Sequence, residues 1–143
     1  KDTNIKIAVS DKTGEAELFF YHNRAAKNTL SKEKGFDSKE IQKIKTSTLN
    51  KVIENSIYKD QKINFISIDV EGYELNVLKG FDLKKYKPDL VVLELIQEGM
   101  TEFFHQNIEN IQNSEVYLYM IKHDYKLINW IHDDLVFVPQ DVK

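Results

Sequence analysis

The chain has no cysteine and no long hydrophobic run among its 143 residues. Without cysteine it forms no disulfide and offers no thiol nucleophile or thiolate metal ligand. No apolar run approaches the roughly 20 residues that cross a bilayer, and the sequence opens without a signal peptide. We therefore expect a cytoplasmic protein that does not bind in a membrane.

An excess of basic residues is also missing. Lys and Arg number 20 against 23 Asp and Glu, which leaves a net charge of -3. Nucleic acids and acidic membrane surfaces select for a basic face, so neither is expected as the main partner. Hydrophobic residues make up 41% of the chain, enough for a core, and no repeat or low-complexity linker divides it. We expect residues 1–143 to form a single domain or part of one.

Hydrophobic periodicity predicts alternating strands and helices. Strands are expected at 4–11, 15–21, around Ile41 and Ile44, at 63–69 and at 90–96, followed by a hairpin of strands 125–131 and 134–140. Helices are expected at 49–57 with a cap at Ser47 or Thr48, at 73–80, through 100–112, and at 115–124 with a cap at Ser114. The polar segment 23–40 is expected to be a surface loop.

The two central strands and one glycine carry further expectations. Segments 63–69 and 90–96 are apolar on both alternations, which is typical of parallel strands covered by helices on both faces. Gly80 stands where the helix 73–80 stops and is expected to be left-handed. The fold class predicted is α/β, with a mostly parallel sheet and an antiparallel C-terminal hairpin.

Acidic residues gather at the ends of these strands. Asp69, Glu71 and Glu74 follow the first strand, and Glu94 lies at the end of the second. Ligands of open parallel sheets bind outside the carboxyl ends of the strands. Carboxylates held close together repel unless a ligand or metal lies among them. The alternative without a ligand is that Asp69 and Glu71 simply favour the start of the following helix.

Several stretches resemble one enzyme family. They are "TSTLNKVIENS", "INFISIDVEGYELNVLKGFD", "KPDLVVLELI" and, near the end, "HDYKLI" with "DLVFVPQ". The second is similar to the signature K-I-D-V-E-G-x-E-x-x-x-L-x-G of the FkbM family of S-adenosylmethionine-dependent methyltransferases. The resemblance covers most of the chain. It implies a Rossmann-like class I methyltransferase sheet with the strand order 3-2-1-4-5-7-6.

The sequence departs from the family in three ways. Ser67 stands where the family usually has Lys, and Asn50 where it usually has Asp. The resemblance also implies that this sequence opens after the first two strands and the glycine-rich loop of the class I sheet, and no glycine pair in it is spaced as G-x-G. We expect a partial methyltransferase domain at 1–143 that binds S-adenosylmethionine weakly or not at all. The strand 63–69 would then have an open edge, and a homodimer through that edge is our hypothesis.

The resemblance implies O-methylation of a hydroxyl on a sugar, glycan or polyketide-like acceptor. Asp69 or Glu71 would be the base or orient the acceptor, and Asp69 would also lie near the cofactor. Glu74 and Glu94 would bind on the acceptor side. By resemblance of "AAKNTLS" to a stretch near the cofactor, further cofactor-binding candidates are Asn28, Thr29 and Ser31.

Two other functions stay open. One is a Mg²⁺-dependent hydrolase or nuclease-like domain that uses the same acids as oxygen ligands. The other is a non-catalytic interaction module. The four histidines show no metal-binding spacing, so no histidine metal site is predicted.

Overall fold

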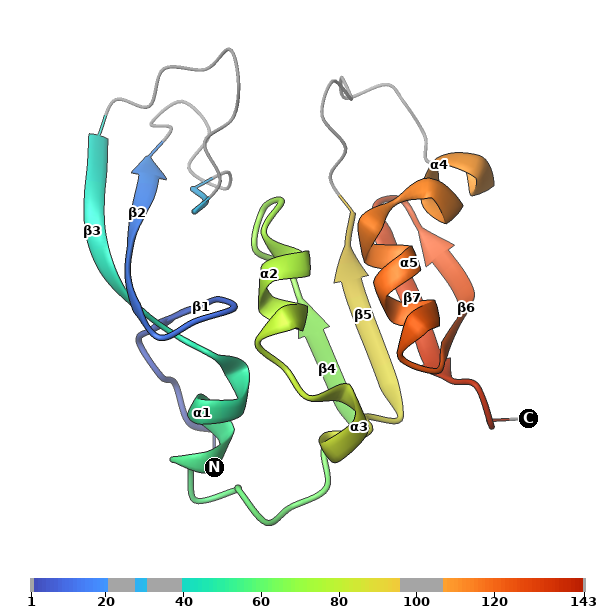
Figure 1. The fold of residues 1–143 in the computed structure, drawn as a ribbon, viewed down its shortest axis with the longest axis horizontal. Helices are drawn as coiled ribbons and strands as arrows, with labels where there is room; N and C mark the ends of the chain where they lie inside the picture. The colour runs from blue at the N-terminus through green and yellow to red at the C-terminus, as the bar shows by residue number, and fades with distance from the viewer. Residues whose placement is uncertain (1, 21–27, 31–39, 96–106, 143) are drawn as a thin grey trace.

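The computed structural model describes residues 2–20, 28–30, 40–95 and 107–142, which form two β-sheets and a layer of helices (Figure 1). The strands are β1 (Ala8–Val9), β2 (Gly14–Phe20), β3 (Glu40–Ser47), β4 (Phe65–Ile68), β5 (Leu90–Glu94), β6 (Tyr125–Ile131) and β7 (Asp134–Pro139). The helices are α1 (Leu49–Glu54), α2 (Glu74–Lys79), α3 (Leu83–Tyr86), α4 (Ile108–Asn113) and α5 (Glu115–Lys122). The predicted α/β class is confirmed. Within these ranges, no helix has the length and apolar character needed to span a membrane.

The first sheet has the order β1-β3-β2. β2 pairs antiparallel with β3 along its whole length, from Gly14 opposite Thr46 to Phe20 opposite Glu40. β1 pairs parallel with β3 through two residues only. The predicted strand at 4–11 is therefore much too long, because Ile5 and Ile7 alternate correctly but remain 53% and 36% exposed. Conversely, the strand expected around Ile41 and Ile44 extends to the full length of β3.

The second sheet has the order β4-β5-β7-β6. β4 and β5 run parallel, while β7 lies antiparallel to both β5 and β6. The predicted C-terminal hairpin is confirmed, with an irregularity in β6 between Leu127 and Asn129. β4 lies at one edge of this sheet.

The expectation of a mostly parallel arrangement is wrong for the described strands. Parallel pairing joins β1 to β3 and β4 to β5, whereas β2–β3, β5–β7 and β6–β7 are antiparallel. The sheets are mixed because β7 returns beside β5 before the hairpin closes, so that the only parallel pair in the second sheet is β4–β5.

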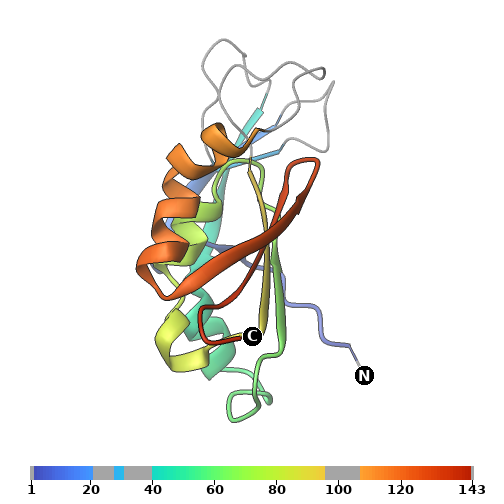
Figure 2. The ribbon, with the colours of Figure 1, turned by 90° about the vertical axis from the view of Figure 1, so that its right-hand side faces the viewer.

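The main core lies between the second sheet and the helices, which Figure 2 shows together on one side of it. Side chains with no exposed surface come from β5, β7, α2 and α5, namely Val91, Leu93, Leu135, Phe137, Leu78 and Met120. On β4, Ile68 is buried and Ile66 packs against this core, as alternate residues of one strand face do.

Among the described residues, no helix covers the other face of β4. Phe65 is 56% exposed and Ser67 is also exposed. The prediction that this strand is buried on both faces is therefore wrong. Its apolar residues alternate with a period of two, and no described helix packs on the second face (Figure 2).

Local capping follows the sequence closely in the helices that flank the sheet. The Thr48 hydroxyl accepts a hydrogen bond from Lys51 N at 3.2 Å, so Thr48 rather than Ser47 caps α1. Ser114 caps α5 by accepting from Tyr117 N at 3.2 Å, as predicted. α1 ends earlier than expected, and Ile57 is 84% exposed instead of packing on the helix face. Of the predicted helix 100–112, residues 100–106 lie outside the described residues.

Gly80 ends α2 for a different reason from the one predicted. Its φ is -89°, so it is not left-handed. A Cβ at this position would lie 2.2 Å from the carbonyl oxygen of Ser10, just after β1. The Gly80 carbonyl also accepts from Asn50 N at 3.1 Å, and the Asn50 side chain accepts from Asp82 N at 2.8 Å. A glycine is required here because two parts of the chain approach closely.

Candidate functional site

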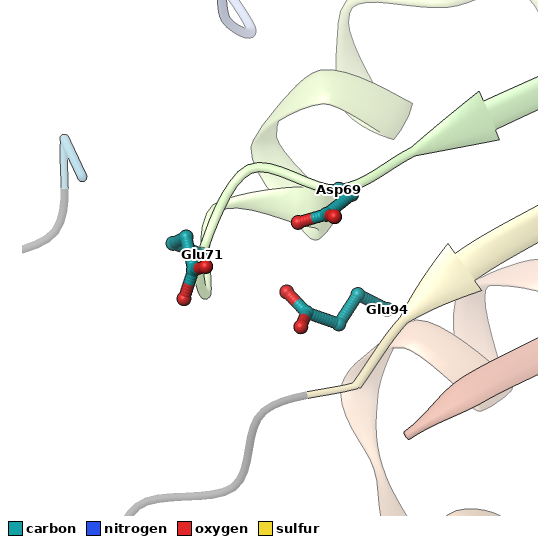
Figure 3. Close-up of side chains that lie close together, drawn as sticks. All are labelled: Asp69, Glu71 and Glu94. Atoms are coloured by element: carbon teal, nitrogen blue, oxygen red, sulfur yellow. The ribbon is translucent and has the colours of Figure 1, made fainter. Parts of the chain in front are cut away.

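Three carboxylates meet at the carboxyl ends of the parallel strands. Asp69 follows β4 directly, Glu94 is the last residue of β5, and Glu71 lies in the loop that leads to α2. One carboxylate oxygen from each lies within 4.8 Å of the others (Figure 3). The sequence prediction that these acids gather at one edge of the sheet is confirmed as geometry, because parallel strands bring their carboxyl ends to the same edge.

The loop between β4 and α2 has an unusual backbone. Glu71 has a φ of 54° and Gly72 a φ of 86°, so two successive residues are left-handed. Glycine adopts this conformation freely, whereas a residue with a Cβ such as Glu loses about 1–2 kcal/mol. Strain of this kind persists only where the surroundings enforce it, and it concentrates at functional sites.

Glu74 lies beneath this loop rather than beside the other acids. It is the first residue of α2 and only 3% exposed. Its Oε1 accepts hydrogen bonds from Val70 N at 3.0 Å and Gly72 N at 3.2 Å. Burial raises the pKa of Glu74, and the bonds from backbone N–H groups partly oppose that effect.

Glu94 is the most perturbed group of the site. Burial, followed by the charges of Asp69 and Glu71, raises its pKa to about 8. A hydrogen bond with the Asp69 carboxyl also favours the protonated form. Its Oε2 is buried, and no group in the described part of the chain forms a hydrogen bond with it. The raised pKa favours the protonated form of Glu94 near neutral pH, in which its carboxyl bonds to that of Asp69.

The candidates from the "AAKNTLS" segment lie on the other sheet. Thr29 is 2% exposed, and its backbone pairs with Phe19 of β2 through bonds of 2.9 and 3.3 Å. Asn28 precedes it and is half-buried. Ser31 lies outside the described residues. The structure therefore groups Asp69, Glu71 and Glu94, and it places Asn28 and Thr29 beside β2.

A separate cleft of about 450 Å³ lies at the opposite end of the second sheet. Its lining includes Lys84, Lys87, His123 and Asp141, and it contains none of the predicted site residues. Lys87 already pairs with Asp141 at 2.8 Å. The cleft is thus distinct from the carboxylate cluster.

Sequence reasoning missed how Glu74 is used. Its spacing from Asp69 and Glu71 marked it as a third acid of the cluster, but its carboxylate points into the loop backbone. The only signal was its position two residues after Gly72, since a left-handed glycine leaves nearby N–H groups in need of an acceptor.

Comparison with known proteins identifies a family. The model of the family described as methyltransferase FkbM domain matches residues 1–127. No curated protein and no solved structure matches the chain.

Proposed function

The chain belongs to the FkbM methyltransferase family, and we propose that it transfers a methyl group from S-adenosylmethionine to a hydroxyl of a sugar, glycan or polyketide-like acceptor. The observation that carries the proposal is the convergence of Asp69, Glu71 and Glu94 at the carboxyl ends of β4 and β5. In parallel α/β sheets this edge is the ligand-binding edge.

We propose that the second sheet is the corresponding part of a Rossmann-like class I sheet. The observed order β4-β5-β7-β6 agrees with the last four positions of the class I order 3-2-1-4-5-7-6. β1 corresponds to strand 3 of that order, and the edge of β4 is where strand 1 would pair. We also expect the chain by itself to bind the cofactor weakly or not at all.

The residues of the cluster suit a cationic methyl donor. S-Adenosylmethionine supplies, when bound, a methyl group on a positively charged sulfur. Burial and then the charges of Asp69 and Glu71 raise the Glu94 pKa, and a positive charge nearby would relieve the repulsion among the three carboxylates. Asp69, at the end of β4, is the residue that we place closest to the donor, with Asn28, Thr29 and Ser31 as weaker candidates.

We assign different roles in methyl transfer to the acids of this chain. Transfer forms a carbon–oxygen bond as the carbon–sulfur bond breaks, and the acceptor hydroxyl must lose its proton. The raised pKa of Glu94 favours its protonated form, which donates to the Asp69 carboxyl, so Glu94 would orient Asp69 beside the acceptor. The base is therefore Asp69 or Glu71, and positioning of the hydroxyl by the three groups supplies much of the rate.

Binding and turnover test this proposal separately. Calorimetry measures S-adenosylmethionine binding to the chain and to a version extended at its N-terminus. Formation of S-adenosylhomocysteine with a panel of sugars, glycans and hydroxylated polyketides measures methyl transfer. Asp69→Asn is expected to lower turnover at least tenfold with an unchanged circular dichroism spectrum. Full turnover in that variant would exclude Asp69 as the base.

The same cluster supports one alternative. Three carboxylate oxygens within 4.8 Å are a ligand set that Mg²⁺ accepts, and a hydrolase would use the ion to activate water. Calorimetric Mg²⁺ binding that Asp69→Ala abolishes, without any binding of S-adenosylmethionine to the extended chain, would favour this function. Binding of neither ligand would favour a non-catalytic interaction module.

A further inference from the structure

Glu74 is the one charged residue that is buried among the described residues. Removing a carboxyl group from water costs several kcal/mol unless hydrogen bonds replace the lost hydration. The side chain lies at the start of α2, where acids are electrostatically favoured. An acid at the start of a helix is favoured without being buried. The burial of Glu74 therefore needs a further explanation.

The contacts of Glu74 point to the loop rather than to the helix. Its Oε1 accepts from the N–H of Val70 and of Gly72, the residues on either side of Glu71. Tyr73, the residue at the helix cap, makes no side-chain capping bond. One oxygen atom therefore holds both flanks of the residue with the strained backbone.

This arrangement determines where Glu71 lies. A left-handed backbone at Glu71 and Gly72 turns the chain sharply, and Glu71 would lose about 1–2 kcal/mol by adopting it without support. Two hydrogen bonds to a charged or buried acceptor are together of comparable size. Figure 3 shows the Glu71 carboxylate close to those of Asp69 and Glu94. The backbone conformation that places it there thus depends on the Glu74 oxygen that accepts from Val70 N and Gly72 N.

We propose that Glu74 is a positioning residue, whose carboxylate oxygen fixes the turn 70–72 so that Asp69 and Glu71 face Glu94. The inference rests on the proposed function for its catalytic consequence, whereas its structural part stands independently. It assigns to Glu74 a role beneath the site instead of contact with the acceptor. An oxygen acceptor is what the turn needs, so a glutamine amide, whose Oε1 can occupy the same place, should serve.

Two variants of the full chain separate the need for a hydrogen-bond acceptor at position 74 from the need for a charge. Glu74→Gln keeps an oxygen at the same reach and removes the charge, whereas Glu74→Ala removes the acceptor. We expect Glu74→Ala to speed amide hydrogen exchange of Val70 and Gly72 about tenfold and to shift the backbone amide resonances of residues 70–72. Glu74→Gln should keep both signals. Val116→Ala, in the buried face of α5, is the control that lowers stability without changing the loop.

Turnover supplies the readout that a merely structural role would not change. In the extended chain, Glu74→Gln is expected to restore kcat for methyl transfer to within about threefold of the wild-type value. Glu74→Ala should lower kcat at least tenfold with little change in KM, because the substrate that receives the methyl group would not contact Glu74.

Each outcome decides the inference. The positioning role is overturned if Glu74→Ala leaves the nuclear magnetic resonance signals of residues 70–72 (the loop signals) unchanged. It is also overturned if Glu74→Gln disturbs the loop signals as strongly as Glu74→Ala does. If Glu74→Ala does not fold, Glu74→Gln alone decides, since loss of the loop signals in that folded variant would show that charge rather than an oxygen acceptor is needed. Absence of methyl transfer in the wild type, with the loop signals as expected, would refute the proposed function and leave the positioning role standing.

Discussion

Replacing Glu94 with glutamine should change how stability depends on pH. The pKa of Glu94 is raised from 4.5 to about 8 in the folded chain, first by burial and then by the charges of Asp69 and Glu71. The unfolded chain loses this proton near the ordinary value, whereas the folded chain retains it up to about 8. Between these values the folded state binds more protons, so the free energy of unfolding falls as pH rises.

The size of the effect follows from the width of that window. One retained proton gives a limiting slope of about 1.4 kcal/mol per pH unit. Glu94 is only partly buried, and solvent screening reduces the real penalty well below that limit. We expect the wild type to lose about 1–2 kcal/mol between about pH 5 and pH 8. The Glu94→Gln side chain is neutral at every pH, so this variant should not show that loss in the free energy of unfolding.

Urea unfolding followed by circular dichroism at several pH values measures the difference. The variant should match the wild type near about pH 5 and exceed its stability by about 1–2 kcal/mol near about pH 9. Glu109→Gln, in the exposed first turn of α4, is the matched control and should leave the wild-type pH dependence unchanged. Parallel curves for the wild type and Glu94→Gln would refute the reasoning.

Three further predictions follow from the backbone and the sheet edge. Gly80→Ala should destabilise the fold by about 3 kcal/mol or more in chemical denaturation, because its Cβ would meet the Ser10 carbonyl oxygen at 2.2 Å. The control Gly14→Ala, whose Cβ would meet no atom within 4 Å, should change the free energy of unfolding by less than about 1 kcal/mol. Glu71→Gly should be about 1 kcal/mol more stable than Glu71→Ala, since only glycine relieves the φ of 54°, while methyl transfer falls in both; equal stabilities would argue against strain. Light scattering at high protein concentration should give a dimeric mass if the β4 edge pairs with a second copy, and Phe65→Lys should shift it toward the monomer; a monomeric wild type would end that hypothesis.

Local chemistry explains which elements were predictable. Thr48 and Ser114 cap their helices as hydroxyl residues do, and the hairpin after α5 follows from two apolar runs around a polar turn. The short helix α3 was missed, although Asp82 signals it by accepting from Lys84 N and Lys85 N at 3.1 and 2.9 Å. These signals act over a few residues, so they can be read without the tertiary structure.

The wrong predictions involve contacts between distant residues. Gly80 looks like an ordinary helix stop, but the glycine is required by a carbonyl oxygen 70 positions away along the chain, at Ser10. Phe65 belongs to an apolar run, yet its face of β4 is uncovered among the described residues. Periodicity identifies a strand and does not specify what packs on each of its faces.

The candidate site was partly predictable for the same reason. Strand ends gave Asp69 and Glu94, because a parallel pair brings them to one edge whatever the side chains do. The sign of φ at Glu71 was not predictable, since nothing in a glutamate requires a left-handed backbone. The position of the Glu74 carboxylate depends on the left-handed turn at Glu71 and Gly72. Neither feature could therefore be predicted without the other.

The departures from local preference are concentrated in one small region. Glu71 adopts a backbone that its Cβ disfavours, Glu74 is buried, and Glu94 holds a proton well above its ordinary pKa. Each of these features lowers stability by itself, and they lie within one loop and the adjoining end of β5. Glycine at 71 and glutamine at 94 would fit the same backbone at lower free energy. The folded chain therefore retains carboxylates at positions 71 and 94 where the fold does not need them, which is the arrangement expected when their chemistry, rather than their packing, is what the site uses.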